Sequence, residues 1–79
     1  MTKKIRVVII DESVLFLNKI SEYLSLDIGI EIVGLATDVY EGRDLIVLEK
    51  ANVVVMDLKL PKMDGLTFLK RLMPQYPLP

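Results

Sequence analysis

The sequence contains no cysteine, no histidine and no tryptophan. Without thiolates or imidazoles we expect neither disulfide bonds nor a zinc site. No basic run is present and the formal net charge is −1, so we expect no nucleic-acid partner. The apolar run that follows Lys3, Lys4 and Arg6 ends at Asp11, too early for a signal peptide or a membrane span. These absences predict a reduced, cytoplasmic protein that does not associate with membranes.

Apolar residues, in contrast, are abundant. They make up 52% of a chain of 79 residues, which is long enough for one domain at most. That share exceeds the usual value for soluble domains. It suggests a core built for more chain than these residues supply, or a surface that a partner covers.

Three short apolar segments rich in β-branched residues predict three strands. They are "KIRVVII" (4–10), "IEIVGLA" (30–36) and "NVVVMD" (52–57). The third is apolar on both faces, which is typical of a strand inside a parallel sheet.

The segments between and after these strands carry apolar residues at helical spacing. A first helix is expected from Ser13, with an apolar side of Val14, Leu17, Ile20 and Leu24. Asp38 and Glu41 form a capping signal for a second helix, whose apolar side is Val39, Leu45, Ile46 and Leu48. A third begins near Gly65, uses Leu66, Leu69 and Leu72, and stops before Pro74.

Strands that alternate with helices predict an α/β fold with a parallel sheet and right-handed crossovers. With strand order 2-1-3, the first and third strands are neighbours, and ligands bind beyond the carboxyl ends of the strands. Asp11 and Glu12 leave the end of the first strand, and Asp57 leaves the end of the third. The predicted fold therefore gathers three carboxylates into one shallow pocket.

Three neighbouring carboxylates raise one another's pKa unless a cation lies among them. Because only oxygen ligands are on offer, Mg²⁺ fits best, and one carboxylate could then act as a phosphoryl acceptor. A single aspartate after a strand is usually a turn residue, but the three together favour a site. Asp64 and Gly65 are interpreted as turn chemistry at a helix start, and Pro61 as a rigid spacer.

Two stretches, "VVIIDES" and "VVVMDLKLPKMDGLTFLKRL", resemble the receiver domain of bacterial two-component response regulators. The shared pattern is an acidic pair after the first strand and, after the third, an aspartate followed by a proline four residues later and then Asp-Gly. The stretches "GRDLI" and "DGLTFLKRLMPQYPLP" are most similar to the chemotaxis response regulators that are protein-glutamate methylesterases. The resemblance covers essentially the whole chain and implies a flavodoxin-like, doubly wound fold.

The resemblance also implies roles for individual residues. Asp57 matches the phosphoacceptor, Asp11 and Glu12 match the acidic pair that binds Mg²⁺, and the backbone carbonyl of Lys59 completes the metal site. The phosphoryl donor would be a sensor histidine kinase. Two residues depart from the family pattern. Glu12 is the second acidic residue, and its longer side chain would shift the position of a bound ion. Leu60 stands where the family often has methionine.

Receivers of this family have five β-α units, whereas residues 1–79 show three. We therefore expect a partial, truncated receiver domain without the last two units and without an output domain. The serine or threonine of the fourth strand, the lysine of the fifth and the nucleophilic serine of the methylesterase have no counterpart here. The chain itself is thus expected to be inactive and not an enzyme, while its intact parent regulates a methylesterase.

Several alternatives stay open at this point. One is a half-domain with a vestigial acidic pocket that forms a homodimer through its third strand, which lacks a neighbour on one side. Another is the receiver of a DNA-binding response regulator. A haloacid-dehalogenase-like phosphatase needs an aspartate where Lys59 stands, and a dinucleotide-binding domain needs glycines that "DESVLF" does not contain.

Overall fold

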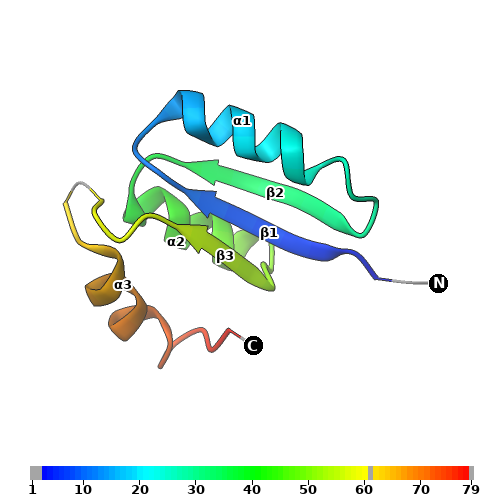
Figure 1. Ribbon diagram of the computed structural model, residues 1–79. Coiled ribbons are helices and arrows are strands. Elements are labelled where there is room, and N and C mark those ends of the chain that lie inside the picture. Colours follow the sequence, from blue (N-terminus) through cyan, green and yellow to red (C-terminus); the bar gives the residue numbers. More distant parts are fainter. Residues whose placement is uncertain (1–2, 61, 79) are drawn as a thin grey trace.

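The computed structural model describes residues 3–60 and 62–78, which form three parallel strands and three helices (Figure 1). In chain order these are β1 (Ile5–Ile10), α1 (Val14–Leu24), β2 (Ile30–Ala36), α2 (Val39–Leu48), β3 (Val53–Met56) and α3 (Gly65–Leu72). The sheet order is β2-β1-β3, which confirms the predicted order and fold class. The second strand has the predicted limits, and β1 and β3 are slightly shorter than predicted. In the described part of the chain, no helix is both long and apolar enough to cross a membrane.

The central strand β1 sets the register of both neighbours. It pairs with β3 without interruption, from Val7 opposite Val53 to Ile10 opposite Met56. Its pairing with β2 shifts between Val7 and Val8, which leaves an additional residue in β2. Because Ile10 and Met56 lie side by side, β1 and β3 end at the same level.

Successive side chains of β1 point to opposite faces of the sheet and enter two separate cores. Val8 and Ile10 belong to the core beneath α2 and α3, which also contains Val39, Ile46, Phe68 and Leu72. Val7 and Ile9 join Leu17 in a smaller core beneath α1. Figure 1 shows the same layering, with α1 on one face of the sheet and α2 on the other.

Three residues assigned to apolar helix sides are in fact exposed. Val14, Leu48 and Leu66 have exposed fractions of 59%, 74% and 57%, so these expectations were wrong. In α3 the core position is filled instead by Phe68, which is 4% exposed and lies one turn before the buried Leu72. Apolar residues occur on several sides of α3, and those that join the core are Phe68 and Leu72.

Candidate functional site

Asp11 and Asp57 lie at the carboxyl edge of the sheet, directly after neighbouring strands. The backbone N–H of Asp57 donates to the carbonyl of Ile10 at 3.1 Å. The backbone N–H of Asp11 donates to the carbonyl of Ala36, at the end of β2, at 3.0 Å. These bonds extend the ladder by one residue, so the backbones of both aspartates are held in place by the sheet.

Each of these carboxylates binds the backbone of its own loop. Oδ1 of Asp11 accepts the N–H of Ser13 at 2.9 Å, and Oδ1 of Asp57 accepts the N–H of Lys59 at 3.0 Å. Such local bonds stabilise the reversal of the chain after each strand. Among the described residues the second oxygen of each carboxylate makes no hydrogen bond. One oxygen thus orients each side chain, and the other can bind a ligand.

Glu12 and Lys59 are exposed on the loops that follow Asp11 and Asp57. Within residues 3–60 and 62–78, no three acidic side chains lie close enough together to hold a metal ion. The described residues thus do not show Asp11, Glu12 and Asp57 gathered in one pocket, and their joint binding of an ion remains a prediction. The fold brings Asp11 and Asp57 to one edge of the sheet, and Lys59, whose carbonyl is the predicted additional ligand, follows two residues after Asp57. An all-oxygen set with few protein ligands fits Mg²⁺, because this ion usually keeps several of its waters.

The start of α3 packs tightly against the loop after Asp57. The N–H of Gly65 donates to the carbonyl of Leu58 at 2.8 Å. A Cβ atom at Gly65 would lie 2.9 Å from the carbonyl oxygen of Asp57 and 3.1 Å from Cα of Leu58. Glycine is required here because of this close approach. It is not required for an unusual backbone conformation, since no glycine of the described chain has a positive φ.

Asp64 is the N-cap residue of α3, directly before Gly65, which confirms its interpretation as a residue of the helix start. Its carboxylate accepts both the N–H and the hydroxyl of Thr67, each at 2.9 Å. The Thr67 N–H, followed by the Thr67 hydroxyl, lowers the pKa of Asp64 below its ordinary value. Both oxygens of this carboxylate are therefore used in capping α3.

Asp38 has a partner that the sequence did not indicate. It caps α2 as predicted, accepting the N–H groups of Tyr40 and Glu41, each at 2.9 Å. Its other oxygen binds Nζ of Lys62 at 3.2 Å, and that ammonium lies 5.8 Å from the centre of the Tyr40 ring. The Glu41 N–H, and after it Lys62, lower the pKa of Asp38. This contact ties the loop after β3 to the start of α2.

Lys62 makes this contact from a backbone φ of 74°, in the left-handed region that non-glycine residues rarely adopt. No sequence signal links it to Asp38, which lies 24 residues earlier. Pro61, interpreted as a rigid spacer, lies outside the described residues. Leu60, which departs from the family pattern, is buried at 9% exposure and packs in the core with Phe68.

Comparison with known proteins agrees with this geometry. A family model described as the response regulator receiver domain matches residues 7–79. A protein-glutamate methylesterase/protein-glutamine glutaminase of Syntrophotalea carbinolica is 53% identical over the whole chain, which covers 22% of that relative. One of Vibrio vulnificus is 40% identical, again over the whole chain and 23% of the relative. The chain thus spans between a fifth and a quarter of the length of these curated relatives.

Solved structures extend the comparison to the fold. The response regulator domain of Thermotoga maritima CheB superposes with a TM-score of 0.89 at 26% identity, covering 96% of this chain and 57% of that one. The receiver domain of the response regulator NarL from Mycobacterium tuberculosis gives 0.86 at 32% identity, covering 98% and 61%. With the sheet order, the paired strand ends and the family match in agreement, this chain belongs to the response regulator receiver domain family.

Proposed function

We propose that this receiver accepts a phosphoryl group on Asp57 from a sensor histidine kinase and thereby controls a protein-glutamate methylesterase. The observation that supports the proposal is the position of Asp57. Its exposed carboxylate leaves the end of β3 level with Asp11 at the end of β1, and one of its oxygens has no protein partner among the described residues.

In this reaction an Asp57 oxygen attacks the phosphorus atom of a phosphohistidine. The P–N bond breaks, the imidazole leaves, and an acyl phosphate forms on Asp57. Asp11, Glu12, Asp57 and the Lys59 carbonyl would hold Mg²⁺, which would offset the charge of the transferring group when bound. The bond from the Lys59 N–H orients the Asp57 side chain and positions its second oxygen.

The output is proposed from the relatives, which are protein-glutamate methylesterases at 53% and 40% identity. A DNA-binding output is less well supported by these identities. The esterase chemistry would lie outside these 79 residues, in a cytoplasmic protein that contains them. The chain on its own should carry little stable phosphoryl label, because receivers offset the phosphoryl charge with a lysine of a fifth strand and the described residues form three strands.

Magnesium binding is the first test, and it uses the 79-residue chain. Titration with Mg²⁺, followed through backbone amide shifts, should first move residues 11–13 and 57–60. Asp57→Ala should abolish these shifts. Asp64→Asn is the matched control, because it changes an acid of the same loop but leaves a residue that caps helices well. Shifts spread evenly over the surface, or kept in Asp57→Ala, would support the vestigial pocket instead.

Phosphorylation is tested in a longer protein that contains this sequence. A small-molecule phosphodonor with Mg²⁺ should label the wild type and Asp64→Asn, whereas Asp57→Asn should remain unlabelled. Robust labelling of Asp57→Asn would disprove the proposed role of Asp57. Stable labelling of the 79-residue chain would show that this lysine matters less than proposed.

A second candidate function, self-association, is favoured by the state of β3. In the described part of the chain β3 pairs only with β1, so its outer edge carries unpaired backbone groups. Val53 and Val55 are 42% and 37% exposed, on the same face of the sheet as α1. An exposed, apolar edge strand of this kind readily pairs with another strand.

A further inference from the structure

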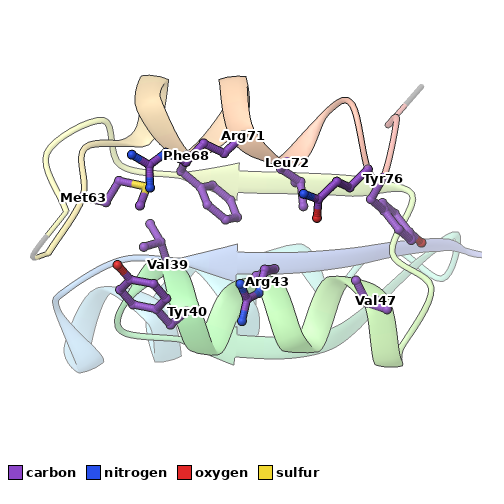
Figure 2. Close-up of a pocket in the computed structure, with 10 residues that line it drawn as sticks. Val39, Tyr40, Arg43, Val47, Met63, Phe68, Arg71, Leu72 and Tyr76 are labelled. Atoms are coloured by element: carbon purple, nitrogen blue, oxygen red, sulfur yellow. The ribbon is translucent and has the colours of Figure 1, made fainter.

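A groove separates α2 from α3 on the face of the sheet opposite α1. It has a volume of about 360 Å³, and its walls include Val39, Arg43 and Val47 of α2 and Phe68, Arg71 and Leu72 of α3. Figure 2 shows Phe68 and Leu72 pointing from α3 toward Val39 and Arg43 of α2. None of Asp11, Glu12, Asp57 and Lys59 lines it, so it is separate from the carboxyl-edge site.

The floor of the groove is apolar and firmly packed. Val39, Phe68 and Leu72 are 1%, 4% and 5% exposed, and all three belong to the larger core. The outer wall is open, because Tyr40 and Val47 on α2 are 44% and 53% exposed. An occupant would therefore meet a floor that needs no rearrangement and a wall of accessible apolar side chains.

The groove is elongated along both helices. On α2 the lining positions 39, 43 and 47 recur every four residues, and positions 68, 72 and 76 repeat this spacing from α3 onward. Eight residues of helix correspond to a length of about 12 Å. This matches roughly two turns of a helix, and a hydrophobic groove between helices is a common way to recognise an amphipathic segment.

The charged side chains in the lining are all positive. Arg43 and Arg71 are both present, and none of the residues that line the groove is acidic. Arg43 contacts Asp44 at 3.5 Å, but both side chains are more than half exposed, so this pair is weak. Within residues 3–60 and 62–78, Arg71 forms no ion pair. A positive groove on a chain of net charge −1 is a local feature that favours a negatively charged partner.

We infer that the α2–α3 groove is a docking site for an acidic amphipathic segment of a partner protein. The segment inserts apolar side chains between α2 and α3, over Phe68 and Leu72, and pairs its carboxylates with Arg43 and Arg71. The length and the open wall of the groove favour a chain segment over a compact small molecule. The inference shares no residue with the proposed phosphoacceptor site and does not depend on it.

The test starts from a random peptide display library selected on the folded 79-residue chain. Selected peptides should be enriched in aspartate and glutamate beside leucine or phenylalanine. A synthetic peptide of the strongest sequence should shift the amide signals of residues 39–47 and 68–76. Selection of basic peptides, no enrichment, or shifts confined to other elements would overturn the proposal.

Variants then test the charge pairing. Arg43→Gln combined with Arg71→Gln should weaken peptide binding about tenfold or more, and added salt should weaken the wild type in the same direction. Lys70→Gln is the matched control, because this exposed cation on α3 does not line the groove. Circular dichroism should show unchanged folding in the double variant and in the control, since every substituted side chain is exposed.

Three further outcomes would contradict the assignment. Equal binding of a peptide whose acidic residues are replaced by lysine would remove the role of the arginines. Phenylacetate that binds as tightly as the peptide would identify a site for small carboxylates instead. Val47→Asp places a negative charge on the open wall and should weaken the acidic peptide, and unchanged binding there would exclude the groove as the site.

Discussion

Asp38 and Asp64 are short-range capping residues with a consequence for the acid stability of the molecule. Each accepts N–H groups in the first turn of its helix, at 2.9 Å, and each has a lowered pKa for that reason. A carboxyl whose pKa is lower in the folded than in the unfolded state stabilises the fold when ionised. Its contribution is complete above about pH 4, the ordinary range of aspartate, and is lost as the pH falls through the folded-state pKa.

We predict that asparagine at both positions reduces this acid sensitivity. Asparagine still accepts a capping hydrogen bond but does not titrate. The urea midpoint of the double variant should therefore fall less between pH 5 and pH 3 than that of the wild type. Asp44→Asn, an exposed acid within α2 that caps no helix, should follow the wild-type curve. Identical slopes for the double variant and the wild type would contradict the prediction.

At the scale of elements, two glycines set how closely helices approach the sheet. A Cβ at Gly42 of α2 would lie closest to Cδ1 of Ile10, the far end of that side chain, and 2.8 Å from its Cγ1. A Cβ at Gly65 would meet backbone atoms of Asp57 and Leu58 at 2.9 and 3.1 Å. The Ile10 side chain is fully buried but can shift at its far end, whereas the backbone of Asp57 and Leu58 is held by the bonds of Asp57 to Ile10 and of Gly65 to Leu58.

We therefore predict that Gly65→Ala is more destabilising than Gly42→Ala. Overpacking at Gly65 should cost about 1–3 kcal/mol of the free energy of unfolding. At Gly42 the gain in helix propensity, about 1 kcal/mol, offsets part of the steric cost. Lys70→Ala, on an exposed side of α3, should stay within about 0.5 kcal/mol of the wild type. Urea denaturation measures all three, and the reverse order of the two glycine variants would contradict the packing argument.

The elements themselves were predictable, because β-branched apolar runs and capping residues are local signals. The burial of individual helix residues was less so. In α3, Leu66 and Phe68 are both large and apolar, yet only Phe68 is buried. The difference depends on which side of α3 packs against the sheet, and this tertiary packing is not contained in any local pattern.

For the whole molecule, the strand order was predictable because parallel strands joined by right-handed crossovers allow few arrangements. That order brings Asp11 and Asp57 to one edge, so this part of the site followed from the sequence. The Lys62–Asp38 pair and the α2–α3 groove did not. Both form between segments far apart in the chain, and their distances depend on how α2 and the loop after β3 pack together.

The exposed edge of β3 leads to the last prediction, that the 79-residue chain associates with itself. Two copies that pair β3 antiparallel about a two-fold axis would join two three-stranded sheets into one and satisfy the unpaired backbone groups of this edge. Sedimentation velocity over a range of concentrations should therefore report a dimer or larger species.

Substitutions on the two faces of β3 separate pairing from folding. Val55→Lys adds a charge to the exposed face, so we expect it to shift the chain toward a folded monomer. Val54 packs against the core beneath α2 and α3, so Val54→Lys should unfold the chain as well as dissociate it. Leu15→Lys, an equally large change on the exposed side of α1, should leave the association unchanged. A wild-type chain that sediments as a folded monomer at every concentration would exclude pairing through β3, and dissociation by Leu15→Lys would place the contact on α1 instead.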